Sequence, residues 1–183
     1  MDDLDRTRKL VAEARWQLIP EEMVIAAFPR EAGSRVLAAL AGVAGVAPLW
    51  WGDDGFEVTV VAPRQALEAG GPRSAEGPMV TGGLDSACGG PMEPGGLGSI
   101  PGARVEAGWA LLTCLTPLPW DVVGFLAGVT ARLAQAGITC GALSAYSHDH
   151  LLVPWARREE ALRLLMRGDG PGSEPGEPRT EPR

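Results

Sequence analysis

The sequence has few aromatic residues, few cysteines and no excess of positive charge, and each shortage excludes a class of protein. Aromatic residues make up only 5% of the 183 residues. The formal net charge of −7 argues against nucleic-acid binding and against a basic protein of membrane surfaces, because both polyanions would repel it. The three cysteines have no close spacing, which fits neither a disulfide framework nor a zinc motif.

The chain also lacks a long apolar run and an amino terminus of the secretory type. Its longest apolar stretch, residues 36–51, is broken by Pro48 and falls short of the roughly 20 residues of a membrane span. The first residues include Asp2, Asp3 and Asp5, where a signal peptide needs positive charge. We therefore expect a cytoplasmic protein with reduced thiols and without a membrane or nucleic-acid partner.

Glycine and proline are abundant, and they concentrate in two segments. They supply 16 of the 35 residues at 70–104 and 8 of the 16 residues at 168–183. Neither segment has enough apolar residues to offset the entropy of ordering a chain. We predict a flexible insert at 70–104 and a disordered tail at 168–183. The rest is expected to form an N-terminal extension at 1–14 and two lobes at 15–69 and 105–167.

The second half of the sequence alternates between strand and helix patterns. Apolar runs bounded by turn residues indicate buried strands, and apolar residues at helical spacing indicate amphipathic helices. Asp121 is the expected N-cap of the first helix and Gly137 its stop signal. The expected elements are strands at 109–115, 138–144 and 150–153 and helices at 122–136 and 157–167.

The first half repeats this order less clearly, with a helix capped by Ser34 and carrying apolar residues up to Val43. Its expected strands are 23–28, 46–51 and 56–61. A βαββα unit that gains one more strand is a ferredoxin-like sandwich, so we predict an α+β fold of two such lobes side by side. Each lobe lacks its last strand, and an exchange would supply it. The front lobe would take residues 109–115, and the back lobe a strand near 16–19.

Several residues of the second half resemble a known family. They are Gly108-Trp109, Pro117-Leu118-x-Trp120-x-x-x-Gly124, Ala136-Gly137-Ile138 and Ser144-x-Tyr146-x-x-Asp149-x-Leu151-Leu152-Val153. The pattern resembles small bacterial proteins with tandem ACT domains, which are similar to the CASTOR-type cytosolic arginine sensors. The resemblance runs from about Glu106 to Leu165. In the first half it is thinner, with Leu18-x-Pro20 and Glu57-x-Thr59-x-Val61-x-Pro63.

This resemblance implies two ACT domains that bind a small ligand, typically an amino acid, at their interface and act as regulatory modules. Ala145 stands where the family often has Thr, which removes one hydroxyl that could bind a ligand. The ligand contacts that the resemblance implies are Asp121, Val122, Gly124 and Phe125 at the helix start and Ala145, Tyr146 and Asp149 in the following hairpin.

The residues themselves leave the role of these acids open. Free N–H groups after Asp121 attract an anion such as an α-carboxylate, while Asp121 itself either binds a cationic group or only caps the helix. Asp149 is either a turn residue or, if both acids face one crevice, part of a site for a cation. His148 and His150 flank the same turn without a third ligand, so we expect no metal and no cofactor.

The leading prediction is a non-enzymatic regulatory or sensor protein that binds an amino acid. The alternative is an ACT-like dimerisation or protein-interaction module without a ligand, with residues 70–104 as a partner-binding segment. A homodimer is expected by analogy, because exposed sheet edges pair between chains. An enzyme is disfavoured, because the sequence has no Ser-His-Asp, Cys-His or phosphate-loop arrangement. Cys114 and Cys140 lie on apolar strands and are expected in the core.

Overall fold

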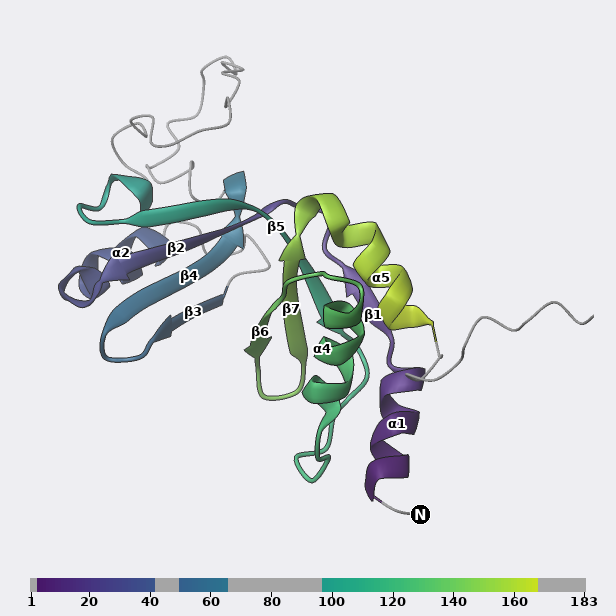
Figure 1. Cartoon of the computed structure of the whole chain (residues 1–183). Coiled ribbons are helices and arrows are strands. Elements are labelled where there is room, and N and C mark those ends of the chain that lie inside the picture. The colour runs from purple at the N-terminus through teal and green to yellow at the C-terminus, as the bar shows by residue number, and fades with distance from the viewer. Residues whose placement is uncertain (1–2, 42–49, 66–96, 168–183) are drawn as a thin grey trace, which may run out of the picture. The chain divides into compact units, whose positions relative to one another are not determined.

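The computed structural model describes residues 3–41, 50–65 and 97–167, which belong to two compact units (Figure 1). One unit is a single stretch of chain, Glu21–Gly108, and is called the continuous unit below. The other combines Met1–Pro20 with Trp109–Arg183 and is called the split unit. Each is described by itself.

The continuous unit is a sheet of antiparallel strands with one helix and a core of its own. In chain order it contains β2 (Met23–Pro29), η1 (Arg30–Ala32), α2 (Gly33–Ala41), β3 (Trp50–Asp53), β4 (Glu57–Pro63), η2 (Leu97–Ser99) and residues 104–108 of β5 (Arg104–Cys114). Strand β4 pairs with β2 on one side and with β3 on the other. Phe28 on β2, Val36 on α2 and Val60 on β4 are fully buried in its core.

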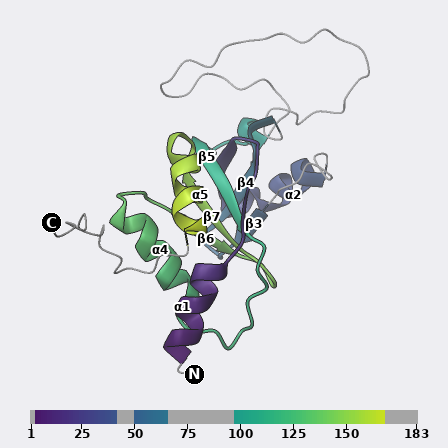
Figure 2. The ribbon, with the colours of Figure 1, turned by 90° about the vertical axis from the view of Figure 1, so that its right-hand side faces the viewer.

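The split unit has a four-stranded antiparallel sheet with helices packed on it (Figures 1 and 2). In chain order it contains α1 (Asp3–Glu13), β1 (Trp16–Leu18), residues 109–114 of β5, α4 (Phe125–Gln135), β6 (Gly141–Ser144), β7 (Asp149–Pro154), η3 (Trp155–Arg157) and α5 (Arg158–Met166). The strand order is β1-β5-β7-β6. Helix α4 packs against α5, and α1 packs against both.

The core of the split unit follows from the apolar periods of its elements. Phe125, Val129 and Leu133 recur every four residues along α4 and are buried together. Alternate residues of β5, namely Ala110, Leu112 and Cys114, are buried in the same cluster, as expected for one face of a strand. Helix α4 ends at Gln135, two residues before the predicted stop signal Gly137, whose φ of +65° is the left-handed conformation that follows many helices.

The predicted fold class of ferredoxin-like α+β lobes is confirmed. As predicted, the sheet of the second half also contains a strand from the N-terminal part of the chain. Strand β1 pairs antiparallel with β5, with Trp16 opposite Cys114 and Leu18 opposite Leu112. It lies where the sequence analysis expected a strand near 16–19. Strand β5 neighbours β2 in the sheet order, so the front lobe gains this strand, while residues 109–114 of β5 pair with β1 and β7 in the split unit.

The units, Met1–Pro20 with Trp109–Arg183 and Glu21–Gly108, differ from the expected ranges at several places. Residues 3–13 of the expected extension form helix α1, which buries Thr7 and Val11 in the split unit. The last part of the expected insert carries η2, and Leu97 and Ile100 are buried in the core of the continuous unit. The burial of these two apolar side chains fixes residues 97–100, which the glycine content of the segment had predicted to be flexible. Residues 42–49, 66–96 and 168–183 lie outside the described residues.

Candidate functional site

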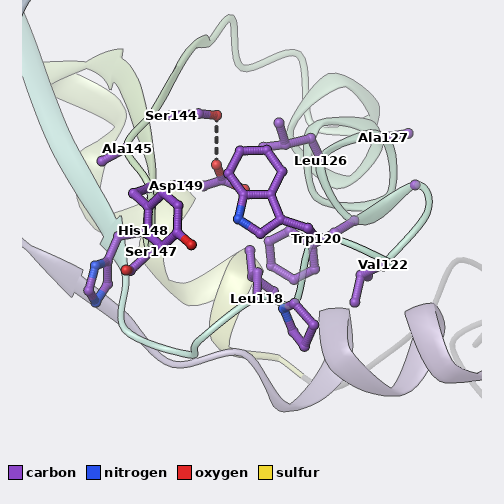
Figure 3. A pocket seen from close by; sticks show the side chains of 14 residues that line it. Leu118, Trp120, Val122, Leu126, Ala127, Ser144, Ala145, Ser147, His148 and Asp149 are labelled. Carbon is purple, nitrogen blue, oxygen red and sulfur yellow. Dashed lines mark hydrogen bonds between the residues drawn. The ribbon is translucent and has the colours of Figure 1, made fainter.

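A cavity of about 290 Å³ lies in the split unit, between the start of α4 and the β6–β7 hairpin (Figure 3). The loop before α4 and the first residues of that helix contribute Leu118, Pro119, Trp120, Val122, Gly124, Phe125, Leu126 and Ala127. The hairpin contributes Ser144, Ala145, Tyr146, Ser147, His148 and Asp149. The structure thus brings six of the seven expected ligand contacts around one cavity and leaves out Asp121.

Three residues of the helix start that line this cavity have backbone N–H groups without a partner in the helix. Gly124 is the N-cap, has a φ of +83° and carries no side chain, so no side-chain cap bond forms. The first intrahelical bond runs from Gly128 N to Gly124 O, at 3.0 Å. The N–H groups of residues 125–127 precede this bond, and all three residues line the cavity. The positive end of the helix dipole therefore faces the space where a ligand would lie.

Helix α4 begins three residues later than expected, and Asp121 is not its N-cap. The Asp121 carboxylate instead accepts hydrogen bonds from Arg6 of α1, with Nη1 to Oδ2 at 2.7 Å and Nη2 to Oδ1 at 3.3 Å. These bonds hold the pKa of Asp121 below its ordinary value. The side chain is 68% exposed and is bound to the N-terminal helix rather than to the helix that follows it.

The hairpin places a carboxylate on the other side of the cavity. Ser144 Oγ donates to Asp149 Oδ1 at 2.7 Å, across the last paired position of β6 and β7 (Figure 3). The turn is closed by a bond of 2.9 Å from Ala145 N to His148 O. Among the described residues that line the cavity, Asp149 is the only acidic one. The arrangement therefore offers N–H donors on one wall and a single negative charge on the other.

Two aromatic rings flank the cavity and are largely exposed. Trp120 is 80% exposed and Tyr146 is 83% exposed, and their ring centroids are 5.9 Å apart with an interplanar angle of 57°. With most of its surface in solvent, Trp120 does not act as a buried hydrophobic staple for α4. Beneath them Phe125 is buried and stacks against Trp16 of β1, with centroids 6.5 Å apart. The cavity thus combines exposed aromatic surface with a rigid apolar support.

The remaining candidate residues take structural positions. Cys114 is buried and burial raises the pKa of its thiol, so it behaves as the expected core residue. His150 lies outside the cavity lining, and its Nδ1 is 3.0 Å from Thr113 Oγ1, a hydrogen-bond distance. No group of three or more potential metal ligands occurs among the described residues. Within the same residues, no helix has the length and apolarity needed to cross a membrane.

Sequence reasoning missed two residues that contact the loop of the site. Arg6 binds Asp121, and the Thr7 hydroxyl donates to the Val123 carbonyl at 2.7 Å. Both belong to α1, more than a hundred positions away in the chain. No spacing rule connects positions so far apart, so only the folded arrangement reveals the contact.

Residues 104–167 match the ACT domain family. This match spans β5 to α5, and therefore contains the whole cavity lining. It covers roughly a third of the chain and does not include α1 or β1. No curated protein sequence matches this chain.

Solved structures with this fold cover both units of the chain. A protein of unknown function from Vibrio cholerae, described as a possible transport protein, is 17% identical with a TM-score of 0.57 over 90% of this chain and 96% of its own. A protein from Agobacterium tumefaciens is 18% identical, with a TM-score of 0.55 over 84% and 87%. The ligand-free regulatory subunit of aspartate kinase from Thermus thermophilus is 16% identical, with a TM-score of 0.54 over 84% and 97%. At these identities the comparison establishes the fold.

Proposed function

We propose that this chain is a non-enzymatic regulatory protein that binds a free amino acid in the cavity of its ACT domain. The proposal is carried by one observation, namely that the first residues of a helix and a carboxylate line the same cavity. An amino acid has complementary charges on one carbon, a carboxylate and an ammonium group. Support also comes from the ACT family match and from the likeness to a regulatory subunit of aspartate kinase.

In this proposal the ligand carboxylate binds the N–H groups of residues 125–127 and the ligand ammonium group binds Asp149. A helix N-terminus favours an anion through both its donors and its dipole. A hydrogen bond between ions is about twice as strong as a neutral one, so Asp149 anchors the cation. The cavity volume of about 290 Å³ is at the lower end of ligand pockets, which suits a small molecule.

Two acids that faced one crevice would favour a cationic ligand, but only Asp149 lines the cavity, so we assign this role to Asp149 alone. Asp121 is bound to Arg6, which neutralises its charge near the helix start. The repulsion that Asp121 would otherwise exert on a ligand carboxylate is therefore reduced. Binding would act by favouring one arrangement of the protein over another, because a ligand shifts an equilibrium only through differential affinity.

A thermal-shift screen of the twenty amino acids tests this proposal. An amino acid present at about 100 times its Kd is expected to stabilise the protein by about 2.7 kcal/mol and so to raise Tm. Asp149→Asn removes a charged hydrogen bond worth about 1.5–3 kcal/mol, which weakens binding roughly 10- to 100-fold. The methyl ester of the responding amino acid lacks the carboxylate charge and is expected to bind much more weakly.

Asp54→Asn is the matched control, because Asp54 is an acid in the hairpin of the continuous unit. Its carboxylate accepts bonds from the N–H groups of Phe56 and Glu57 and has no place in the cavity. This variant is expected to keep the full response to ligand. No Tm change with any amino acid, or an unaltered response in Asp149→Asn, would contradict the proposal.

A second candidate function is a protein-interaction module without a ligand, and the exposed cluster of Trp120, Val123 and Tyr146 favours it. All three side chains are more than two-thirds exposed beside the cavity. Exposed apolar clusters of this kind mark interaction surfaces. In this case no amino acid would change Tm, and Trp120→Ala would weaken self-association measured by sedimentation velocity. Homodimerisation remains a prediction for the same measurement.

A further inference from the structure

We infer that helix α1 positions the loop of the binding cavity, with Arg6 and Thr7 as the positioning residues. This inference rests on the proposed function for its ligand measurement, but not for its measurement on the free protein. Arg6 holds the carboxylate of Asp121 through two hydrogen bonds, at 2.7 and 3.3 Å. One residue further along α1, the Thr7 hydroxyl donates to the Val123 carbonyl at 2.7 Å.

The segment after α1 holds the other end of the same loop. Leu115 N donates to Arg15 O at 2.7 Å, and Arg15 N donates to Thr116 Oγ1 at 2.9 Å. The loop between β5 and α4 is therefore bound by the N-terminal segment at residues 115–116 and again at 121–123. Between these two attachments lie Leu118, Pro119 and Trp120, which line the cavity.

Helix α1 itself packs against α4. Thr7 and Val11 of α1 are buried, and Val11 belongs to the core of the split unit. The two helices approach closely at Gly128, where an added Cβ would lie 3.1 Å from Val11 Cγ2. Gly128 is also the residue that donates the first intrahelical bond of α4, to Gly124 O. Packing of α1 thus acts one turn from the N–H groups that line the cavity.

These contacts have a direct consequence for ligand binding. Fixing a backbone residue costs about 1–2 kcal/mol of conformational entropy, which a ligand must supply if the loop is loose beforehand. Attachments to α1 hold residues 121–123 before the ligand arrives. Arg6 also offsets the negative charge of Asp121 close to the helix start. Both effects favour binding of an anionic group at residues 125–127, although neither Arg6 nor Thr7 lines the cavity.

Hydrogen exchange of the full-length protein without ligand tests the positioning role first. We expect the amides of residues 122–127 to exchange at least several-fold faster in Arg6→Ala and in Thr7→Val than in the wild type. Arg8→Ala is the matched control, because Arg8 is exposed and pairs with Asp5 of its own helix. Thr7→Ser keeps the hydroxyl and is expected to behave as the wild type. Unchanged exchange of 122–127 in both Arg6→Ala and Thr7→Val would overturn the inference.

Ligand affinity provides the second measurement, with the amino acid that raises the wild-type Tm as the probe. Arg6→Ala is expected to bind this amino acid about three- to tenfold more weakly, because binding must then supply the entropy of ordering one additional side chain or loop segment. The charge exchange of Arg6→Asp with Asp121→Arg is expected to recover most of the loss, while either single change is not. A loss that the exchanged pair does not recover at all would overturn the role of the ion pair.

The two proposals fail in different ways. If no amino acid binds the wild type, the proposed function is contradicted, while hydrogen exchange still decides whether α1 positions the loop. If Asp149→Asn weakens binding but Arg6→Ala, Thr7→Val and the wild type bind equally, the proposed function stands and the positioning role is overturned.

Discussion

The two units of this chain differ in how a strand connects to the helix that follows it, β2 to α2 in the continuous unit and β5 to α4 in the split unit. In the continuous unit β2 ends at Pro29, and the single turn η1 leads directly into α2 at Gly33. In the split unit β5 ends at Cys114 and α4 begins only at Phe125. The longer connection, residues 115–124, supplies five of the residues that line the cavity. The longer connection thus accompanies a cavity at the start of the following helix.

The hairpins of the two units use their acids differently. In the continuous unit Asp53 accepts a bond from Gly55 N, and Asp54 accepts bonds from the backbone N–H groups of Phe56 and Glu57. Both carboxylates stabilise their own turn, as Asp often does. In the split unit Asp149 accepts from the Ser144 side chain and lines the cavity. An acidic residue in a hairpin is therefore a candidate for ligand binding only when its carboxylate is not used for hydrogen bonds to the backbone of the turn.

Core substitutions are expected to give the largest effects and to separate the units. Leu133→Ala in the split unit should cost about 2–5 kcal/mol of unfolding free energy, and Phe28→Ala in the continuous unit about 3–5 kcal/mol, because both side chains are fully buried. Urea unfolding followed by circular dichroism measures both. The folded fraction of Phe28→Ala should keep its response to the amino acid, and a lost response would mean that the cavity depends on the continuous unit.

A pair of glycines at the two helix starts is expected to respond with opposite signs. Gly124→Ala should cost about 1–2 kcal/mol, since Gly124 has a φ of +83° that an L side chain disfavours. Gly33 has a φ of −52°, and an added Cβ would meet Val58 Cγ2 at 3.5 Å, an ordinary contact. Gly33→Ala should therefore stabilise by about 0.4–1 kcal/mol. Denaturant midpoints measure both, and effects of equal sign would contradict the backbone argument.

A smaller effect is expected from His150, whose pKa is lowered by burial and by the charge of His148. The folded protein then binds this proton less readily than the unfolded chain does. Stability should fall as the pH drops from the ordinary histidine value of 6.5 towards the lowered value in the fold. His150→Gln is expected to flatten this part of the profile. An equally steep decline in the variant would assign it to another group.

The smallest effect is expected from Asp121, because its ion pair with Arg6 lies in solvent. Its lowered pKa means that the pair contributes stability above the ordinary carboxyl value of 3.8 and loses it as the pH falls through the value in the fold. Exchange rates of residues 122–127 in the wild type and in Asp121→Asn should therefore differ at neutral pH and converge in acid. Convergence already near neutral pH would contradict the assignment.

Local patterns predicted much of the fold, because apolar periodicity and turn residues act over short distances. The glycine at 137, which follows an apolar helical pattern, predicted where α4 would stop. The apolar residues near 16–19, which stand apart from the other strands, predicted a strand that pairs with the second half. Leu97 and Ile100 could not be assigned in the same way, because they are two apolar residues in a glycine-rich stretch. They are buried only because they pack against the core of the continuous unit, which is formed by residues distant in the sequence.

The cavity lining was predicted in part, and the error concerns Asp121, whose carboxylate can either cap the following helix or bind Arg6. Asp121 has the position of an N-cap relative to the apolar pattern, but the left-handed Gly124 delays the helix, and Arg6 binds the carboxylate instead. The N-terminal helix gave no clear signal, because it buries only Thr7 and Val11 among its described side chains. The choice between a local cap and a distant ion pair is made by tertiary packing.

The discontinuous origin of the split unit affects the order in which it can be assembled during translation. The ribosome releases α1 and β1 before the continuous unit, and β5 and α4, which cover Trp16 and Val11, follow only after nearly all of that unit has been synthesised. At about 5–20 residues per second the early segment waits several seconds for its partners. During that interval Val11 and Trp16 lack the later residues that bury them in the folded protein.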